Sequence, residues 1–297
     1  MIFGVMWNLT VLYMSILLCV KMRRLIPLVS LSCFNNSRYI MSKEDKYTAE
    51  TITEITTWAS NLFSFKLTRY TGYRFIPGQF SRLGIRKEDG TIVWRAYSIV
   101  SASYDEFLEY FSIVVPDGEF TSRLSKLEVG DEVLVEKMNY GFLTTARFEE
   151  GKDLWMLATG TGLAPFISIL YELETWDAYE NIILVYSVRE ANELAYIEAI
   201  EGLKNHEYFG DFAHKFKFLP VVTREKFPGA LEKRIPILLE NGELEQELGL
   251  SLDPERSRIM ICGNPEMVDD TRGWFTEHGY TVSRRSKPGH LALENLW

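Results

Sequence analysis

The sequence contains few cysteines, and this limits the sites it can form. Only three occur in 297 residues, Cys19, Cys33 and Cys262, and none belongs to a C-x-x-C pair or stands beside a histidine cluster. Zinc and iron–sulfur sites need several such ligands at close spacing, so no metal site is expected. A disulfide framework is not expected either, and the composition favours a reducing, cytoplasmic compartment.

A concentrated basic segment is also missing. The formal net charge is −9, and no block of Lys and Arg alternates with aromatic residues. Nucleic acid is therefore not an expected partner, because its recognition needs a clustered positive surface. The chain instead has the composition of a folded protein, with 46% hydrophobic and 25% charged residues and enough length for two compact domains.

Residues 1–40 differ from the rest of the chain. Met1 to Val20 contains no charged residue, and a basic cluster follows at once in residues 21–24. A secretory signal carries its positive charges before the apolar run, so this order argues against one. Three interpretations stay open: a gene model that starts before the natural start at Met41, a membrane anchor of about twenty residues with a cytoplasmic basic flank, or a cleaved targeting segment.

Residues 47–148 are rich in short β segments. Turn signals such as Pro77-Gly78 and Gly130-Asp131 separate these segments. This spacing predicts an antiparallel barrel or sandwich. The expected strands are Thr51–Trp58, Leu62–Arg69, Val93–Val100, Leu108–Val115 and Glu132–Lys137.

Residues 153–297 show a different pattern, in which apolar strand-like runs alternate with helical ones. This alternation predicts β–α units around a parallel sheet. The expected strands are Leu154–Ala158, Ile182–Val188, Phe216–Val222 and Arg258–Cys262. The expected helices are Ala164–Glu174, Ala191–Leu203, Arg234–Leu239 and Pro265–His278.

The segment Arg95-Ala96-Tyr97-Ser98 lies in an expected strand and gives the first indication of chemistry. Alternate side chains of a strand share a face, so Arg95 and Tyr97 project to one side and Ser98 to the other unless the strand bends. An arginine can pair with a phosphate, and a tyrosine ring can stack on a planar heterocycle. An exposed Arg and a half-buried Tyr on an ordinary strand are the alternative.

A turn at Pro116-Asp117-Gly118 leads into a short expected helix that begins near Thr121 and Ser122. Backbone N–H groups at the start of a helix can cradle a phosphate, and either hydroxyl can add a donor. A simple helix N-cap is the alternative.

The segment from Ala158 to Pro165, ATGTGLAP, joins an expected strand to an expected helix. Gly160 and Gly162 let the backbone approach a pyrophosphate, and Pro165 suits the first turn of the helix. The segment departs from the G-x-G-x-x-G fingerprint because Pro165 occupies the position of the third glycine.

No acidic ribose ligand, which would select NAD, is apparent at the end of the next expected strand; Tyr186, Ser187 and Arg189 are there instead. Arg224 follows the third strand of this half, and Arg234 begins the next helix. Arginines favour the additional phosphate of NADP. Each of them taken alone is also compatible with an ordinary solvated surface.

Two further features lie in the C-terminal part of the chain. Cys262 begins the segment CGNPEM at the carboxyl end of an expected strand, which is where open α/β sheets bind ligands. A lone cysteine is more commonly a small buried hydrophobic residue. The terminal Trp297 either packs against the protein or stacks on an aromatic cofactor.

Taken in order, RAYS, GEFTSRL, ATGTGLAP, VTRE, CGNPEM and an aromatic C-terminus resemble the bacterial branch of the ferredoxin–NADP reductase family. The resemblance covers the chain from about Tyr47 to Trp297. It implies an antiparallel Greek-key barrel that binds FAD, followed by a Rossmann-like domain that binds NADP. It also implies hydride transfer from NADPH to FAD and single-electron transfer to ferredoxin or flavodoxin. A monomer is expected.

The resemblance also implies roles for individual residues of the FAD site. Arg95 and the adjoining Ala96 meet the FAD pyrophosphate, Tyr97 stacks on the flavin, and Ser98 lies near flavin N5. Gly118 and Thr121 meet the FAD phosphates, and Trp297 contacts FAD. At the next-to-last position, where relatives can present an aromatic ring, this chain has Leu296.

The implied NADP site includes the ATGTGLAP segment and three arginines. Cys262 and Glu294 are implied to flank the nicotinamide and to position it, not to act as a covalent nucleophile and a general base. The remaining implied NADP residues are Thr159, Gly160, Thr161, Gly162, Arg189, Arg224, Arg234 and Gly263.

An acidic carrier requires a local basic surface on a chain of net charge −9. The candidates, each also compatible with a solvated face, are Arg82, Arg86, Lys87, Arg284, Arg285 and Lys287. Two other functions stay open at this stage. One is an NADH- or NADPH-dependent reductase that serves a haem protein, an oxygenase, free flavin or a quinone, and the other is a flavin-binding sensor tethered to the membrane by Met1 to Val20.

Overall fold

The computed structural model describes residues 46–295, which form one antiparallel and one parallel sheet. The open interpretations of Met1 to Val20, and the expected roles of Leu296 and Trp297, fall outside the described residues. No helix within residues 46–295 combines the length and apolar character that crossing a membrane requires.

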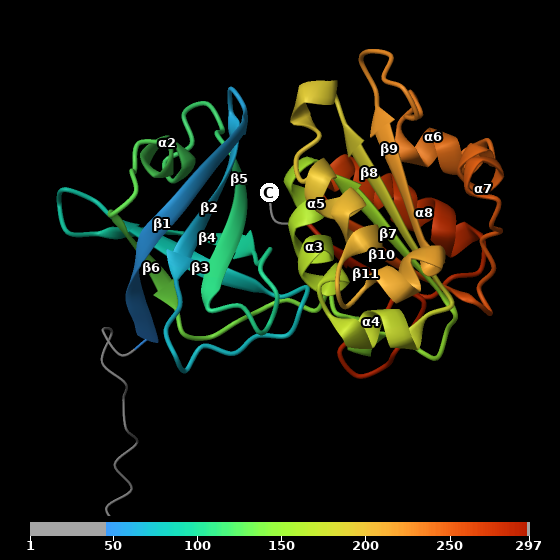
Figure 1. Cartoon of the computed structure of the whole chain (residues 1–297), viewed down its shortest axis with the longest axis horizontal. Helices are drawn as coiled ribbons and strands as arrows, with labels where there is room; N and C mark the ends of the chain where they lie inside the picture. Colours follow the sequence, from blue (N-terminus) through green and yellow to red (C-terminus); the bar gives the residue numbers. More distant parts are fainter. Residues whose placement is uncertain (1–45, 296–297) are drawn as a thin grey trace, which may run out of the picture. The chain divides into compact units, whose positions relative to one another are not determined.

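Six antiparallel strands form a barrel lobe in the first part of the described chain, in the order β4-β3-β6-β1-β2-β5 (Figure 1). The two edge strands also meet, because Ile99 bridges Tyr110 and the Val100 N–H donates to the Glu109 carbonyl at 2.9 Å. The expected antiparallel barrel is therefore confirmed. The strands are β1 (Tyr47–Ala59), β2 (Leu62–Thr68), β3 (Phe80–Arg86), β4 (Ile92–Ser98), β5 (Phe107–Ile113) and β6 (Glu132–Glu136).

Strand β3 is missing from the sequence prediction. Its sequence, FSRLGIR, contains two arginines and Gly84, which dilute the β-branched and aromatic residues typical of strands. The strand forms because β4 pairs with it along its whole length, from Phe80 opposite Ser98 to Arg86 opposite Ile92. This pairing places β3 directly beside the RAYS segment.

Five parallel strands form the sheet of an α/β lobe, in the order β11-β10-β7-β8-β9. The predicted parallel sheet is confirmed, with β11 as a strand that the sequence did not indicate. The strands are β7 (Asp153–Thr159), β8 (Asn181–Val188), β9 (Phe216–Val222), β10 (Ser257–Cys262) and β11 (Leu291–Glu294).

The described part of the chain also contains helices in both lobes. The α-helices are α2 (Thr121–Leu124), α3 (Ala164–Leu170), α4 (Leu173–Ala178), α5 (Ile197–Gly202), α6 (Ile235–Glu240), α7 (Glu243–Leu248) and α8 (Pro265–Glu277). The 3₁₀ helices are η3 (Thr145–Arg147), η4 (Gly160–Leu163), η5 (Ala191–Glu193), η6 (Leu203–Asn205) and η7 (Gly210–Lys215).

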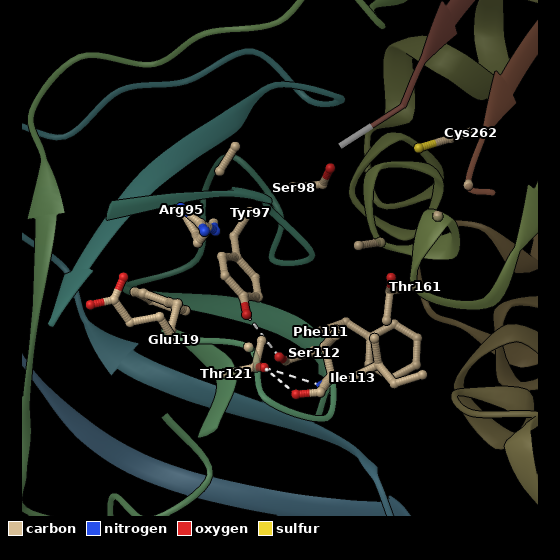
Figure 2. A pocket seen from close by; sticks show the side chains of 17 residues that line it. Arg95, Tyr97, Ser98, Phe111, Ser112, Ile113, Glu119, Thr121, Thr161 and Cys262 are labelled. Carbon is tan, nitrogen blue, oxygen red and sulfur yellow. Dashed lines mark hydrogen bonds between the residues drawn. The ribbon is translucent and has the colours of Figure 1, made fainter. Parts of the chain in front are cut away.

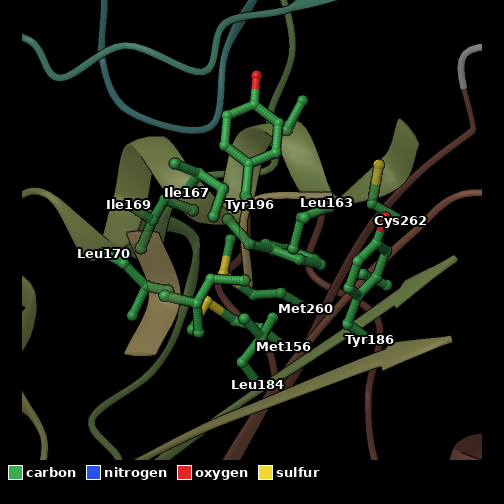
Figure 3. Packing of buried hydrophobic residues seen from close by; sticks show 14 of the residues in the cluster. Met156, Leu163, Ile167, Ile169, Leu170, Leu184, Tyr186, Tyr196, Met260 and Cys262 are labelled. Carbon is green, nitrogen blue, oxygen red and sulfur yellow. The ribbon is translucent and has the colours of Figure 1, made fainter. Parts of the chain in front are cut away.

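Alternate residues of the parallel strands supply two hydrophobic clusters, one on each face of the sheet. On β7, Met156 and Ala158 belong to one cluster, and Trp155 and Leu157 belong to the other. Helices α3, α4 and α5 cover the first face, whose packing Figure 3 shows, and α6, α7 and α8 cover the second (Figure 1). Burial of each large apolar side chain stabilises the fold by about 1.5–3 kcal/mol.

The first cluster continues into the barrel lobe, where Leu62, Phe111 and Leu143 belong to it. Buried hydrogen bonds reinforce this shared core. The Ser168 hydroxyl, for example, donates to the Ser101 carbonyl at 2.8 Å. Residues 46–295 accordingly belong to one compact unit, so a site between the two lobes is fixed by packing.

Two of the expected helices are interrupted. The helix predicted over Ala164–Glu174 divides into α3 and α4. The one predicted over Ala191–Leu203 is broken at Tyr196, whose φ of 62° places it in the left-handed region. The Tyr196 hydroxyl donates to Glu109 Oε1 of the barrel lobe at 2.7 Å, and its ring lies 5.3 Å from the Phe111 ring. This contact between the lobes compensates for the unfavourable local conformation.

Candidate active site

A cavity of about 330 Å³ is lined by both lobes (Figure 2). Its size falls within the range of small-molecule sites. Ten of the residues singled out in the sequence line it: Arg95, Ala96, Tyr97, Ser98, Gly118, Thr121, Thr161, Gly162, Cys262 and Gly263. Segments separated by more than a hundred residues therefore meet at one site.

Tyr97 is held rigidly in the wall of the cavity. Its hydroxyl forms a hydrogen bond of 2.9 Å with the Ser112 hydroxyl, and its ring lies 5.5 Å from the ring of Phe120. Burial raises the pKa of Tyr97 to about 12. The side chain is therefore a neutral, fixed aromatic plate in the physiological range.

Arg95 is the cation of this cavity. Its residue is exposed, and Nη1 donates to the Trp94 carbonyl at 3.0 Å. No carboxylate within residues 46–295 forms an ion pair with it. A guanidinium with free N–H groups at the edge of a cavity is suited to bind a phosphate.

Ser98 lines the same cavity as Tyr97, although strict alternation would place the two on opposite faces. The difference arises because β4 ends at Ser98, where the barrel closes through the bridge between Ile99 and Tyr110. Ser98 is 7% exposed, and no described residue hydrogen-bonds its side chain. Its hydroxyl can therefore interact with a ligand.

The segment at α2 contributes only part of what the sequence suggested. Thr121 lines the cavity, whereas Ser122 does not. The Thr121 hydroxyl accepts a hydrogen bond of 3.1 Å from the Val115 N–H, which closes the turn before the helix. Since α2 has four residues, the turn itself, and not a long helix, presents Thr121 and Gly118 to the cavity.

The glycine segment of the α/β lobe forms η4. Gly160 has a φ of +52°, and a Cβ atom there would have no neighbour within 4 Å, so it borders open space. Gly162 is different, because a Cβ there would lie 2.3 Å from the Cys262 carbonyl oxygen and 2.7 Å from the Gly263 Cα. Gly162 is thus required for close packing of two turns, a role that sequence reasoning had not assigned to it.

Cys262 and Glu294 lie side by side on neighbouring strands, since their Cα atoms are partners in the β10–β11 register. Burial, and then the Glu294 charge, raise the pKa of Cys262 well above its usual value, so the thiol stays protonated. Burial also raises the pKa of Glu294 to about 8. Its Oε2 atom is buried without a hydrogen-bond partner among the described residues. Cys262 lines the cavity, whereas Glu294, beside it on the next strand, does not.

The three predicted phosphate arginines lie away from this cavity. Arg189 and Arg224 are adjacent, because the Arg224 N–H donates to the Arg189 carbonyl at 2.9 Å. Arg234 precedes α6, three residues after Leu231 returns to pair with Val221 of β9. These arginines therefore gather at the carboxyl ends of β8 and β9. Thr159 accepts a hydrogen bond of 2.8 Å from the Asn264 N–H, joining the ends of β7 and β10.

Seven residues that line the cavity had been given no individual role from the sequence: Phe111, Ser112, Ile113, Val115, Glu119, Phe120 and Ala164. Most come from β5 and the turn that follows it. Thr121 could have indicated Glu119 and Phe120 from the sequence, because a turn that presents Thr121 to the cavity also presents these two residues. No local signal marks Ser112 as the partner of Tyr97, since that contact depends on barrel closure.

Comparisons with known proteins agree with this geometry. Residues 50–139 match a family model described as an oxidoreductase FAD-binding domain, and residues 156–273 match an oxidoreductase NAD-binding domain. The chain is 43% identical over 252 residues to a ferredoxin–NADP reductase of Pseudomonas aeruginosa, covering 84% of this chain and 96% of that protein. It is 38% identical over 247 residues to a flavodoxin/ferredoxin–NADP reductase of Escherichia coli, covering 83% and 97%.

A solved structure with the same architecture is that of a ferredoxin NADP⁺ reductase from Neisseria gonorrhoeae with bound FAD and NADP. The TM-score is 0.79 and the sequence identity is 42%, covering 85% of this chain and 99% of that one. The similarity extends over both lobes, so it includes the cavity between them.

Proposed function

Since this chain belongs to the ferredoxin–NADP reductase family, we propose that it transfers electrons between NADPH and a small carrier protein, ferredoxin or flavodoxin. The observation that supports this most directly is the cavity where Arg95, Tyr97 and Ser98 of one lobe meet Gly162 and Cys262 of the other. One NADPH yields two electrons and a proton, so it reduces two one-electron carriers.

The barrel lobe fits FAD. Bound FAD supplies the redox chemistry, because it accepts a hydride and releases electrons singly. The unpaired Arg95 guanidinium and the turn at Gly118 and Thr121 would bind its phosphates, and the fixed Tyr97 ring would stack on its flavin. The Ser98 hydroxyl, which lines the same cavity, would form a hydrogen bond with flavin N5.

The α/β lobe fits NADP. Gly160, Thr161 and Gly162, with Thr159 and Gly263 beside them, hold the pyrophosphate, and the open space at Gly160 leaves room for it. Of the arginines at the ends of β8 and β9, Arg224 and Arg234 bind the 2′-phosphate, and Arg189 lies near the pyrophosphate. A preference for NADPH over NADH follows from these positive charges.

Cys262 and Glu294 position the nicotinamide. The protonated thiol is a compact, weakly polar wall and not a nucleophile, because its pKa is well above the physiological range. Glu294, whose pKa is about 8, is mostly protonated at pH 7 and can donate a hydrogen bond from its place beside Cys262. Together they orient the ring without forming a bond to it.

The proposed function is tested by mixing the purified full chain anaerobically with NADPH or NADH. We expect a visible flavin spectrum before mixing and rapid bleaching by NADPH, with NADH at least about tenfold slower because it lacks the charged phosphate. Stopped-flow absorbance measures both rates. A protein that carries no flavin, or a flavin that NADPH does not bleach, would refute the proposal.

Substitution of Ser98 by Ala tests the hydrogen bond at the flavin. We expect flavin reduction by NADPH to slow by about 10–100-fold, the cost of one lost hydrogen bond in a water-poor site. FAD should stay bound, because Arg95 and Tyr97 are unchanged. Single-turnover absorbance measures the rate, and the visible spectrum measures FAD content. Ser122→Ala, the same change at a residue of α2 that does not line the cavity, is the matched control; equal rates in the two variants would contradict the role.

A further inference from the structure

Strands β8 and β9 both lead into an Arg-Glu pair. Arg189 and Glu190 directly follow β8, and Arg224 and Glu225 come two and three residues after the end of β9. Because β8 and β9 are neighbouring parallel strands (Figure 1), both pairs lie at the same edge of the sheet. All four residues are exposed. The proposed function uses the two arginines and leaves the two glutamates without a role.

The Glu225 carboxylate ties the segment after β9 to the segment after β8. Backbone pairing continues one step beyond the strands, since the Arg224 N–H donates to the Arg189 carbonyl at 2.9 Å. Glu225 Oε1 then accepts a hydrogen bond of 2.6 Å from the Ala191 N–H, 34 residues earlier in the chain. Hydrogen bonds to an ionised acceptor are about twice as strong as neutral ones. Glu225 therefore fixes the backbone on the far side of Arg224.

The other carboxylates at this edge also bind backbone and not the arginines. Glu193 Oε2 accepts hydrogen bonds from the Arg189 N–H at 2.9 Å and the Glu190 N–H at 3.1 Å, and the Glu190 side chain accepts from the Glu193 N–H in return. Within residues 46–295, no ion pair involves Arg189, Arg224 or Arg234. The guanidinium groups thus stay available for a phosphate although acidic side chains surround them in the sequence.

A carboxylate beside a phosphate site has two opposite effects on affinity. Its charge repels the phosphate, which between exposed groups at physiological ionic strength costs about fivefold in affinity or less. Its hydrogen bonds to the backbone hold a neighbouring arginine in place, and one well-placed bond between a guanidinium and a phosphate is worth at least about tenfold. Positioning is therefore the larger effect, and the two effects predict opposite changes when the carboxylate is removed.

We propose that Glu225 is a positioning residue that sets the preference for NADPH over NADH, an inference that rests on the proposed function. By joining its segment to Ala191, it holds the backbone at Arg224 in the conformation that directs the guanidinium to the 2′-phosphate. Fixing a binding group before the ligand arrives raises affinity, because less conformational freedom is lost on binding. NADH has no 2′-phosphate, so Glu225 contributes to the binding of NADPH alone.

Three variants of the full-length holoenzyme separate positioning from charge. Glu225→Ala removes both the acceptor for the Ala191 N–H and the negative charge. Glu225→Gln keeps an acceptor oxygen and removes only the charge. Glu232→Ala is the matched control, because Glu232 is exposed, lies two residues before Arg234 and forms no ion pair with a described residue. It removes a charge near the same phosphate site without removing a bond between the two segments.

Stopped-flow flavin reduction at varied NADPH or NADH concentration gives an apparent Kd and a limiting rate for each nucleotide. We expect the apparent Kd for NADPH to rise about tenfold in Glu225→Ala and to stay within threefold of wild type in Glu225→Gln and Glu232→Ala. The apparent Kd for NADH and the limiting rate with NADPH should change less than twofold in Glu225→Ala. Calorimetric titration of the oxidised enzyme with 2′,5′-ADP, which carries the 2′-phosphate but no nicotinamide, should show the same tenfold loss.

The wild-type enzyme separates this inference from the proposed function. If NADPH does not reduce its flavin, or reduces it no better than NADH does, the proposed function fails first. If wild type prefers NADPH but Glu225→Ala binds NADPH and 2′,5′-ADP as tightly as Glu232→Ala does, the carboxylate acts only through its charge and the positioning role is overturned. Equal losses for NADPH and NADH in Glu225→Ala would overturn it as well, because they would indicate a general structural effect.

Discussion

Replacement of Gly162 by Ala is expected to reduce the rate of flavin reduction by NADPH by about 100-fold or more. The added methyl group would lie 2.3 Å from the carbonyl oxygen and 2.5 Å from the carbonyl carbon of Cys262. Both atoms belong to the backbone and cannot move aside alone. The turn at η4 and the turn after β10 must therefore separate, which displaces Cys262 from the wall of the cavity.

The same substitution should lower the free energy of unfolding by about 1–3 kcal/mol, the usual cost of overpacking. FAD should remain bound, because Arg95, Tyr97 and Thr121 lie in the other lobe. Stopped-flow absorbance and thermal melting measure the two effects. Gly202→Ala in α5, where a Cβ meets nothing within 4 Å, is the matched control and should leave both quantities near wild type. A Gly162→Ala enzyme that is reduced within twofold of the wild-type rate would show that the two turns need not touch.

The sequence was sufficient where local patterns determine the structure. Continuous apolar runs predicted β7, β8, β9 and β10, because the strands of a parallel sheet covered on both faces are apolar on both sides and the run lengths are typical of such strands. The Asn264-Pro265 start of α8 carries its own cap, since the Asn264 side chain accepts from the Met267 N–H at 3.2 Å. Such signals involve residues within a few positions of each other.

Contacts between distant segments explain what the sequence did not predict. Strand β3 depends on β4 and β6 for its pairing, and β11 on β10. The break at Tyr196 depends on Glu109, 87 residues earlier in the chain. No local pattern reports such partners, so propensity alone extended the helix through Tyr196.

In the candidate site, too, local patterns were predictable and contacts between distant segments were not. The segments that contain Arg95, Thr121, Gly162 and Cys262 could be recognised individually from residue type and context. Their meeting at one cavity depends on how the two lobes pack, and the reason for Gly162 became evident only from its contact with Cys262.

Replacement of Glu294 by Gln is expected to stabilise the protein increasingly as the pH rises from 5 to 8. Burial raises the pKa of Glu294 from 4.5 to about 8. Below pH 4.5 this carboxyl is neutral in both the folded and the unfolded chain, so it contributes no pH dependence. Between pH 4.5 and 8 the folded state binds a proton that the unfolded state does not, so the stability of the wild type decreases with rising pH. Above pH 8 the folded group is also ionised and the penalty is constant.

The size of this effect follows from the shift. Each pKa unit corresponds to about 1.4 kcal/mol, so a few kcal/mol separate pH 5 from pH 8.5. For a protein of this size, each kcal/mol changes the melting temperature by about 2–4 °C. The melting temperature of Glu294→Gln should therefore equal that of wild type near pH 5 and exceed it by several degrees at pH 8.5. Glu277→Gln, the same chemical change at an exposed position near the end of α8, is the matched control.

The rate of flavin reduction by NADPH should also depend on the protonation of Glu294. At pH 7 both protonated Glu294 and Gln can donate a hydrogen bond toward the nicotinamide side of the cavity, so flavin reduction by NADPH should be similar in wild type and Glu294→Gln. Above pH 8 the wild-type carboxyl becomes an anion that can only accept, and its rate should change with an apparent pKa near 8, whereas the Gln variant should have no such step. Stopped-flow rates between pH 6 and 9.5 measure both profiles. If the step persists in Glu294→Gln while the melting difference appears as expected, Glu294 is a buried acid without a role in positioning the nicotinamide; if neither profile differs from wild type, its carboxyl is already ionised at neutral pH.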